Sequence, residues 1–456
     1  MRRLRWSSLL SQERLTPSQG GDPWRNEFER DYDRAVFCTP VRRLQDKAQV
    51  FPMEEHDAIR TRLTHSLEVS TVARTIARAS AVWLAKEKEI ECLPQGDQVA
   101  QIETIAATCG LIHDLGNPPF GHAGEEAIRE WFLNNHGARI KKIRRKQQQC
   151  ADDFVHFDGN AQTIRLLTRL QMFGDQQGLN LTCATLSSAL KYVSPSHETI
   201  EARHDASKPG YFASEKAIVE VVGKKTGTEG VRHPITFLVE AADDIVNATV
   251  DVEDAIKKGV IKWAEFEAQL RTSKDSQVVK VLKETKKLAK GRQKNPTDET
   301  YAQAFRVAAI QVMVGAVLES FRGKYEDIMH GKYHNELLKT SVAGELRGIC
   351  KTVLKQRVFP SDLILRVEMR GKIVIHDLLD MFWDGAAVCD EKTNKGTEFD
   401  GKIYKLVSSN YRHVFHKEKS GSQLPELYHR LQLVTDYLAG MTDTFASTLH
   451  KRLRNG

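Results

Sequence analysis

Apolar residues recur three or four positions apart in one segment of the chain after another, and this spacing places them on one side of an α-helix. Such stripes run through residues 67–79, 102–109 and 237–245. Residues 300–321 are apolar on nearly every side, as in a buried helix. Few segments alternate with the two-residue period of a strand. The sequence therefore predicts a mostly α fold, with one small hairpin near residues 211–236, where glycines flank a valine-rich stretch.

Length and composition are those of an ordinary soluble protein. The 456 residues suffice for two to four domains at about 100–200 residues each. No stretch approaches the ~20 apolar residues of a membrane span, and the N-terminal residues lack the ~7–15-residue apolar region of a signal peptide. The seven cysteines are scattered without a C-x-x-C pair, so neither a disulfide framework nor a zinc knuckle is favoured. We therefore expect a reduced, cytoplasmic protein.

Two basic runs stand out in a chain whose net charge is only +7. They are KKIRRKQQQ at 141–149 and KETKKLAKGRQKNP at 283–296. Each run suits a solvated helix face or loop, and each also suits a patch that binds nucleic acid or phosphate. Neither contains the interleaved aromatic residues that stack on single-stranded nucleic acid, so the sequence leaves both interpretations open.

A His-Asp doublet, His113 and Asp114, follows an apolar run that directs it toward the interior. Two such side chains are costly to bury unless they are paired or bound to a metal ion. Adjacent helical residues point about 100° apart, so both reach one ion only at a helix end or a distorted turn. The glycine and prolines that follow supply that break. His65 with Asp243 or Asp244, each on another amphipathic helix, would complete a set of two imidazoles and two carboxylates.

A second pair, His122 and Glu125, follows the proline turn at the start of a predicted helix. Residues three apart share a helix face, so the carboxylate could hold the imidazole in one tautomer, as a general acid beside a metal requires. The alternative is that Glu125 only interacts favourably with the helix dipole. The spacing alone does not decide between the two.

The order H…HD…D resembles the HD-domain metal-dependent phosphohydrolases, and longer strings narrow the resemblance to deoxyguanosinetriphosphate triphosphohydrolases. The bare pattern is unspecific because many phosphodiesterases share it, whereas HDLGNPPFGHxGE together with RTRLTHSLEV is specific. The absence of G-x-x-x-x-G-K-[ST] disfavours a P-loop nucleotidase. The strings cover most of the chain and are RLQDKAQVFPMEEHDAIRTRLTHSLEV (43–69), GLIHDLGNPPFGHAGEEAI (110–128), HFDGNAQTIRLL (156–167), KPGYFASE (208–215), AADDIVNATVDVEDA (241–255) and GMTDTFA (440–446).

The resemblance implies a mostly α fold with an HD-domain helical core and appended N- and C-terminal helices. It divides the chain into an N-terminal arm (1–50), an HD phosphohydrolase core (51–255) and a helical C-terminal region packed on the core (256–456). It implies hydrolysis of dGTP, and in some relatives of other dNTPs, to the deoxynucleoside and tripolyphosphate. The implied cofactor is a divalent metal ion, Mg²⁺ or Mn²⁺, and Fe or Co would also suit mixed nitrogen and oxygen donors.

Several residues of this chain occupy the motif positions of the family's functional residues, and the resemblance implies the same roles for them. His122 and Glu125 match the catalytic His and its carboxylate partner. The family's metal ligand is the first Asp of the doublet at 243–244. The implied metal ligands are therefore His65, His113, Asp114 and Asp243.

Further matches concern the substrate. Gln49 matches a residue near the sugar 3′-hydroxyl, whereas Arg62, Lys208 and Tyr211 match positions that contact phosphate. Where the family often has a tyrosine against the sugar, four residues after the metal Asp, this chain has Asn247. A shorter amide cannot stack on deoxyribose or exclude a 2′-hydroxyl in the same way, so the departure concerns selectivity for dGTP.

The resemblance also implies binding partners, and other functions stay open. Family members form homo-oligomers, often hexamers, and some bind single-stranded DNA. The chain could instead be another HD-type hydrolase, such as a nucleotide phosphodiesterase or 5′-nucleotidase, or a non-catalytic protein that binds single-stranded nucleic acid. Loss of a metal ligand would mark the non-catalytic case, and all four candidates are present.

Overall fold

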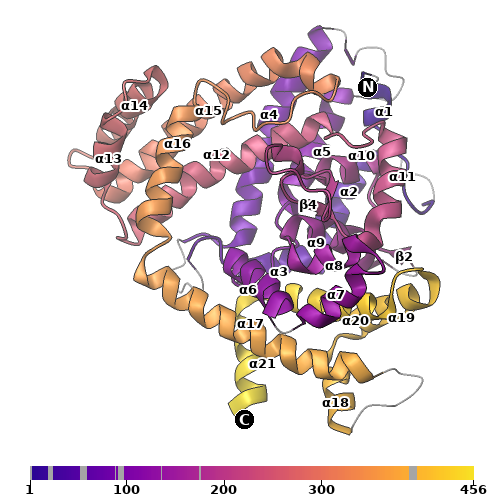
Figure 1. Ribbon diagram of the computed structural model, residues 1–456. Coiled ribbons are helices and arrows are strands. Elements are labelled where there is room, and N and C mark those ends of the chain that lie inside the picture. The colour runs from indigo at the N-terminus through magenta and orange to yellow at the C-terminus, as the bar shows by residue number, and fades with distance from the viewer. Residues whose placement is uncertain are drawn as a thin grey trace.

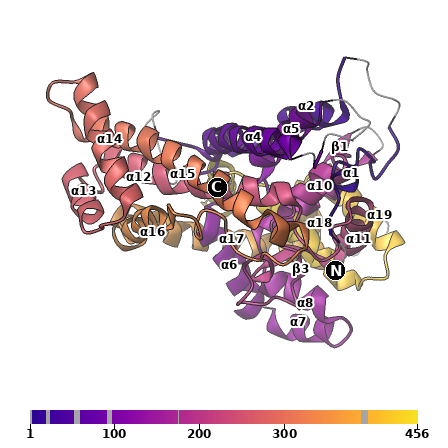
Figure 2. The same ribbon diagram turned by 90° about the horizontal axis from the view of Figure 1, so that it is seen from above.

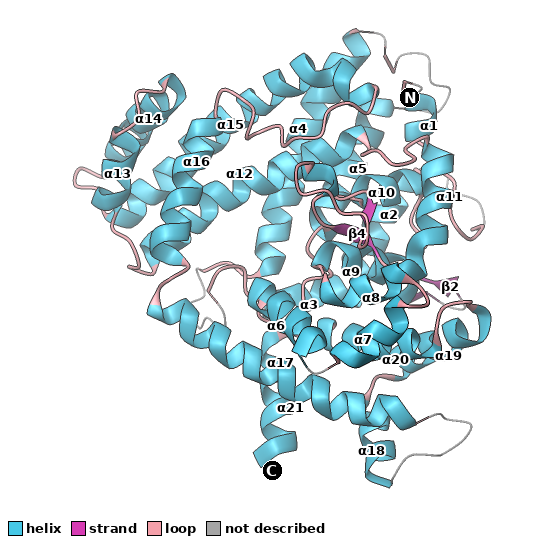
Figure 3. Ribbon diagram, in the orientation of Figure 1, coloured by secondary structure: helices cyan, strands magenta, loops and turns pink. Residues whose placement is uncertain are grey.

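The computed structural model describes residues 3–18, 24–51, 59–87, 89–90, 97–134, 136–173, 176–389 and 398–455. Helices make up most of this part of the chain, which confirms the predicted mostly α fold (Figure 1, Figure 3). The helices up to residue 257 are α1 (Trp6–Leu9), α2 (Glu27–Phe37), α3 (Thr39–Arg43), α4 (Arg62–Lys86), α5 (Gln98–Ile112), α6 (Gly121–Asn134), α7 (Gly137–Arg144), α8 (Gln148–Val155), α9 (Gly159–Arg165), α10 (Cys183–Ala189), α11 (Lys216–Thr226) and α12 (Pro234–Lys257).

The C-terminal part continues with nine α-helices in the described residues. They are α13 (Trp263–Arg271), α14 (Ser276–Arg292), α15 (Asp298–Met329), α16 (Gly344–Val353), α17 (Asp362–Val388), α18 (Glu398–Leu406), α19 (Ser409–Gly421), α20 (Glu426–Ala439) and α21 (Asp443–Asn455). Short 3₁₀ turns are η1 (Leu44–Asp46), η3 (His204–Ala206) and η4 (Ala213–Glu215), and π-helical turns are η2 (Leu166–Leu170) and η5 (Leu354–Val358).

The strands that the structure describes form two short pairs. β1 (Met172–Phe173) pairs with β2 (Gln176–Gln177) in antiparallel, and β3 (Ser194–Pro195) pairs with β4 (Pro209–Tyr211) in parallel. The hairpin predicted near residues 211–236 is wrong, because the valine-rich stretch at its centre lies in α11. Gly227 adopts a left-handed φ of 72° and ends the helix, so this glycine is a helix C-terminal stop.

Helices α4, α5 and α12 pack against one another at the centre of one hydrophobic core. The last two turns of α5, residues 105–112, are buried on every side. At Gly110 the backbone of α5 touches α4, because a Cβ there would lie 2.7 Å from the Cα atom of Ser70. Glycine thus permits the close approach that places His113, at the end of α5, beside His65 on α4.

Helix α15 is long and apolar enough to cross a membrane by length and composition. It packs against α4, α12 and α14, and its residues Phe305, Met313 and Phe321 are fully buried in the protein. We therefore interpret α15 as a core helix, as its sequence predicts. The six cysteines in the described part of the chain are buried and unpaired, and Cys92 lies outside it.

The C-terminal helices build a second hydrophobic core with α6 and α8. Helix α17 packs against α6, α20 and α21, and in Figure 1 it runs across the lower part of the molecule. Helices α13 and α14 lie at one end (Figure 2). The C-terminal region is therefore joined to the elements that follow the His-Asp doublet. The division at residues 50 and 255 stays a prediction.

Buried ion pairs connect these C-terminal helices to α9. Arg165 is almost fully buried and lies 2.7 Å from Asp436, 3.0 Å from Glu215 and 3.1 Å from Glu418. Burial alone would lower the pKa of Arg165, but the three carboxylates outweigh it and raise the pKa. Removing Arg165 would leave these buried carboxylates without their shared cation, which is strongly destabilising.

Asp153 on α8 provides a stability prediction. It is fully buried and accepts hydrogen bonds from the backbone N–H of Ala213 and the hydroxyls of Ser196 and Tyr428. Burial raises its pKa to about 7, above the ~3.9 of an exposed aspartate. Folding therefore takes up a proton between about pH 4 and pH 7, and this group's contribution to stability falls as the pH rises through that window.

We expect Asp153→Asn to remove this contribution, because an amide has no proton to take up and can still pair with the same three groups. Relative to the wild type, the variant should gain stability between pH 5 and pH 8, on the order of a few kcal/mol. Thermal unfolding at several pH values measures the difference. An unchanged offset between the two proteins at all pH values would contradict it.

Candidate functional site

A cavity of about 660 Å³ is lined by residues of α4, α6, α12 and α16 and of the loops between helices. Its volume lies within the ~300–1,000 Å³ of small-molecule sites. Two of the predicted site residues do not line it: His65, which is completely buried, and Tyr211. The predicted residues that line it are Gln49, Arg62, His113, Asp114, His122, Glu125, Lys208, Asp243 and Asn247.

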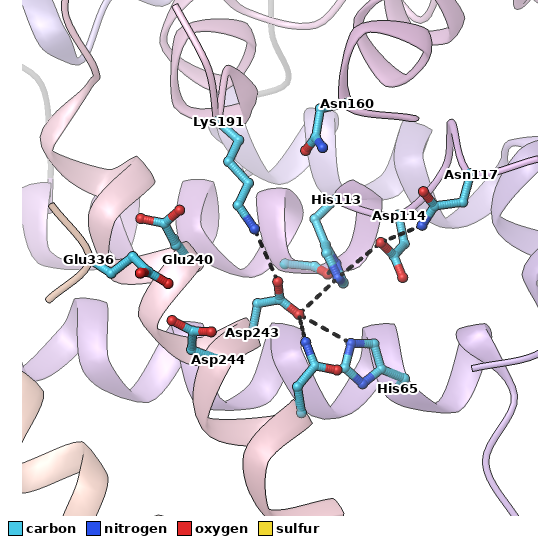
Figure 4. A network of polar contacts seen from close by, with 12 residues as sticks. His65, His113, Asp114, Asn117, Asn160, Lys191, Glu240, Asp243, Asp244 and Glu336 are labelled. Atoms are coloured by element: carbon cyan, nitrogen blue, oxygen red, sulfur yellow. Dashed lines mark hydrogen bonds and ion pairs between the residues drawn. The ribbon is translucent and has the colours of Figure 1, made fainter. Parts of the chain in front are cut away.

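Three side chains from α4, the end of α5 and α12 converge on one point (Figure 4). They are His65, His113 and Asp243, whose donor atoms lie within 4.8 Å of one another. Asp243 Oδ1 is 3.3 Å from Nε2 of His65 and 3.4 Å from Nε2 of His113. The helix packing at Gly110 thus produces a compact group of two imidazoles and a carboxylate.

The orientation of His113 fits a metal ligand. Its Nδ1 lies 2.8 Å from the carbonyl oxygen of Gly110, and because a carbonyl only accepts, Nδ1 must carry the hydrogen. Nε2 is buried, faces Asp243 and has no hydrogen-bond partner in the part of the chain that the structure describes. A backbone carbonyl that fixes the tautomer in this way is typical of metal-bound histidines, so the residues present fit a divalent cation.

The charges around the cluster also favour a bound cation. Burial alone would lower the pKa of His113, but Asp114 and Asp243 outweigh it and raise the pKa to about 9. Burial alone would raise the pKa of Asp243, but Lys191, 3.3 Å away, and the two histidines hold it well below its usual range. The site therefore favours positive charge beside ionised carboxylates, and a bound cation would take the place of the His113 proton.

Asp114 lies beside this group and is not one of the three residues whose donor atoms converge. Its Oδ1 is 3.5 Å from Nε2 of His113 and accepts a hydrogen bond from the Asn117 amide at 2.7 Å. Its Oδ2 lies 2.5 Å from Arg62. Burial opposes ionisation, but His113 and Arg62 hold the pKa of Asp114 below its usual range. The carboxylate is therefore charged and oriented beside the cluster.

His122 stands at the rim of the cavity, with 84% of its side chain exposed. Its Nδ1 lies 2.9 Å from Oε2 of Glu125, whose side chain is only 3% exposed. The other oxygen of Glu125 accepts the backbone N–H of Gly159 at 2.7 Å. Glu125 is thus held by the protein and orients the imidazole, one of the two roles that the spacing left open, and the opposite ring nitrogen has no partner among the described residues.

Polar side chains continue from the cluster along one face of α12. Asn247 donates a hydrogen bond to Oδ1 of Asp243 at 2.7 Å and accepts one from Gln49 at 3.0 Å. Asp251, one turn further on, lines the cavity, is 6% exposed, and has a buried Oδ1 with no hydrogen-bond partner. Asp251 escaped the sequence interpretation, although its spacing of four and eight from Asn247 and Asp243 could have placed it on this face.

Cationic side chains border the same cavity. Lys208 lies 3.0 Å from Asp158, and its side chain is 42% exposed. Lys191 and Tyr192 also line the cavity, although the sequence interpretation missed them. No local signal marks them, because the preceding segment at 183–190 mixes apolar residues with three hydroxyl side chains. From the C-terminal region, Lys351 and Lys355 complete the cationic lining.

Tyr211 is not among the described residues that line the cavity, and its assignment to the substrate stays a prediction. Tyr211 is buried in strand β4, and burial raises the pKa of its hydroxyl to about 12, with the carboxylates of Glu198, Glu220 and Asp153 adding to the effect. Tyr192, which precedes the partner strand β3, occupies the cavity wall instead.

The two basic runs lie on helices away from the cavity lining. Residues 141–149 span the end of α7 and the start of α8, and residues 283–296 cover the second half of α14. On α14 the apolar side, with Val278, Val281 and Ala289, is buried, whereas most of the lysines face solvent. This arrangement fits a solvated helix face and is equally accessible to an anionic partner.

Comparison with known proteins gives two kinds of match. Residues 62–169 match the HD domain, and residues 341–452 match the phosphohydrolase-associated domain. The deoxyguanosinetriphosphate triphosphohydrolase-like protein of Listeria innocua is 34% identical over 463 residues, 99% of each chain. That of Synechocystis is 33% identical over 473 residues, again 99% of each. The deoxyguanosinetriphosphate triphosphohydrolase of Serratia proteamaculans is 30% identical over 477 residues, 94% of this chain and 93% of the relative.

The converging donors predict the effect of removing one. We expect His113→Ala to weaken the binding of Mn²⁺ by more than about tenfold, since even changes behind a ligand cost about 10–100-fold. Titration calorimetry measures the affinity. His330→Ala, at a partly exposed histidine that directly follows α15, is the matched control and should bind Mn²⁺ as the wild type does. Equal affinity in the two variants would contradict the assignment.

Proposed function

Since the chain belongs to the deoxyguanosinetriphosphate triphosphohydrolase family of HD-domain hydrolases, as its motifs predict, we propose that it hydrolyses dGTP to deoxyguanosine and tripolyphosphate. The observation that carries the proposal is the convergence of His65, His113 and Asp243 in the wall of a nucleotide-sized cavity that lysines also line. Metal donors beside cations are what hydrolysis of a polyphosphate requires.

HD-domain hydrolases depend on a metal ion, and in the proposal His65, His113, Asp114 and Asp243 hold Mg²⁺ or Mn²⁺. A bound divalent ion supplies Lewis-acid chemistry, lowering the pKa of a water molecule and polarising the α-phosphoryl oxygen. Arg62 keeps Asp114 ionised and oriented. Lys191 does the same for Asp243 from the opposite side.

Charge neutralisation is the main requirement of a loose phosphoryl-transfer transition state. Arg62, Lys191 and Lys208 line the cavity and supply positive charge near the metal donors. Arg62 can in addition make paired contacts with phosphate oxygens because its guanidinium is planar. In the proposal these three side chains bind the triphosphate, and Tyr192 contributes to the wall on the same side.

His122 is the proposed general acid. Attack at the α-phosphorus expels the 5′-oxygen of the nucleoside, which is a poor leaving group without a proton. Nδ1 of His122 faces Glu125, so the opposite ring nitrogen is available to deliver that proton. The buried Glu125, held by Gly159, would stabilise the charged imidazole during the transfer.

The polar face of α12 supports binding of a deoxyribose. Gln49 and Asn247 are joined to each other and to Asp243. Burial, with Asp254 and Asp243 nearby, raises the pKa of Asp251, and its carboxyl oxygen Oδ1 can accept a hydrogen bond from a sugar hydroxyl. In the proposal Gln49 and Asp251 bind the 3′-hydroxyl. Asn247 fills the position where the family often has a tyrosine.

The finer expectations of the family resemblance belong to the same proposal. They are a homo-oligomer, a cytoplasmic location, the division of the chain near residues 50 and 255, and binding of single-stranded DNA. The second domain match, at 341–452, lies within the proposed C-terminal region. The exposed lysines of α14 support an anionic partner such as single-stranded DNA. The binding constant for that partner would fall with rising salt concentration, with a slope that corresponds to a few phosphate contacts.

Product analysis tests the proposal. The purified protein is incubated with each dNTP and with GTP in the presence of Mg²⁺ or Mn²⁺, and the products are separated by anion exchange. Deoxyguanosine and tripolyphosphate, chiefly from dGTP, are expected. Pyrophosphate or orthophosphate would favour another HD-type hydrolase, and no product under any condition would favour a binding protein.

The role of His122 predicts a variant that separates catalysis from metal binding. We expect His122→Ala to lower turnover by about 10²–10⁴-fold, the loss typical of a general acid. Its Mn²⁺ affinity should equal that of the wild type, because His122 is not one of the three converging donors. Steady-state kinetics and calorimetry together measure both. Loss of Mn²⁺ binding would contradict the assigned role.

The contact between Gln49 and Asn247 predicts an effect on sugar selection. We expect Gln49→Ala to reduce the preference for dGTP over GTP by about tenfold, the value of one to two hydrogen bonds, with a smaller effect on turnover. A sugar that is no longer fixed at its 3′-hydroxyl can shift and accommodate a 2′-hydroxyl. Comparison of kcat/KM for the two nucleotides measures the ratio. An unchanged ratio would remove Gln49 from the sugar site.

A further inference from the structure

The turn that leads into His122 holds an unusual backbone conformation. Phe120 has a φ of 64° and the next residue, Gly121, a φ of 59°. Glycine adopts this left-handed region freely, whereas a bulky side chain such as phenylalanine rarely does. Such a conformation persists only where surrounding contacts determine it. The contacts on Phe120 therefore decide where α6 begins and where His122 lies.

Two contacts from the C-terminal region hold Phe120. Its backbone N–H donates to Oδ1 of Asp443, at the start of α21, at 2.8 Å. Its ring lies against Gly371 of α17, where a Cβ would come within 2.6 Å of the ring carbon Cγ. The sequence separation between Phe120 and Asp443 is 323 residues, so a distant part of the chain sets this turn.

The second oxygen of Asp443 reaches another part of the site. Oδ2 accepts the backbone N–H of Ala48 at 3.0 Å, directly before Gln49. Asp443 is 2% exposed, and both of its oxygens are used by segments outside its own helix. Nearby, Lys47 donates to the carbonyl oxygens of Asn117 and Ala439, which joins the same segments again.

We infer that Asp443 is a positioning residue that fixes His122 and Gln49 relative to each other, with Gly371 as the second support of the His122 turn. This inference rests on the proposed roles of His122 and Gln49. It makes the phosphohydrolase-associated region a part of the active site, because one carboxylate of that region binds both segments that would contact the leaving nucleoside.

The test compares Asp443→Ala with Thr444→Val in the full-length protein. Thr444 is the next residue and donates to Asp46 at 2.7 Å, so its variant breaks a neighbouring contact and leaves Phe120 and Ala48 held. We expect Asp443→Ala to lower kcat by about 10- to 100-fold, the cost of a small misplacement at a reacting centre. Mn²⁺ affinity should not change, and Thr444→Val should retain wild-type kinetics.

A double-mutant cycle distinguishes positioning from a general structural defect. If Asp443 acts through His122, Asp443→Ala should reduce kcat only slightly further in a His122→Ala background. Equal fold-losses in both backgrounds, or loss of Mn²⁺ binding with Asp443→Ala, would overturn the inference. Gly371→Ala, which pushes on the Phe120 ring, should reproduce the kinetic loss, with Gly323→Ala, where a Cβ meets open space, as its control.

A readout without turnover separates this inference from the proposed function. Bound Mn²⁺ enhances the relaxation of nearby nuclei with a steep dependence on distance, so the ring resonances of His122 report its distance from the cluster. We expect this relaxation to change in Asp443→Ala and Gly371→Ala and to stay constant in the two controls. Constant relaxation in all four variants would overturn the inference even if tripolyphosphate is the product. A change in the absence of any tripolyphosphate would support positioning while the proposed function fails.

Discussion

The backbones of α4 and α5 meet at Gly110, and the site depends on this contact. A side chain at that position would collide with Ser70 and separate the two helices. His65 and His113 would then move apart, since one lies on α4 and the other at the end of α5. The same glycine contributes the carbonyl that fixes the His113 ring. A single residue without a side chain thus sets both the distance between the two imidazoles and the orientation of one of them.

The buried carboxylates in and directly beside the cluster are each paired with a positively charged side chain. Asp114 faces Arg62, and Asp243 faces Lys191, so each carboxylate stays ionised despite burial. Within the described residues, Nε2 of His113 is left without a hydrogen-bond partner. The arrangement also spaces cations around the cavity before any anionic substrate enters, which lowers the reorganisation that binding requires.

The helices and the cluster of His65, His113 and Asp243 could be predicted from the sequence, because the patterns that indicate them are local. The stripe spacing predicts α4, α5, α12 and α15, and the His-Asp doublet before a glycine-proline turn predicts a polar group at a helix end. The hairpin prediction failed because a glycine that ends a helix was interpreted as a strand turn. Asp443 and Tyr192 gave no usable signal, since their roles depend on contacts with segments far away along the chain.

Asn247 shows how the chain accommodates its departure from the family pattern. Its amide is oriented unambiguously, because the NH₂ group donates to Asp243 and the oxygen accepts from Gln49. A tyrosine at this position would carry its hydroxyl on a long ring, further from the backbone than the short amide that lies between Asp243 and Gln49. The amide therefore lacks the stacking surface of a tyrosine ring, but it links Asp243 to Gln49 through hydrogen bonds. In the proposed function, selection of the sugar depends on the placement of Gln49, and Asp443 holds the residue before it through the N–H of Ala48.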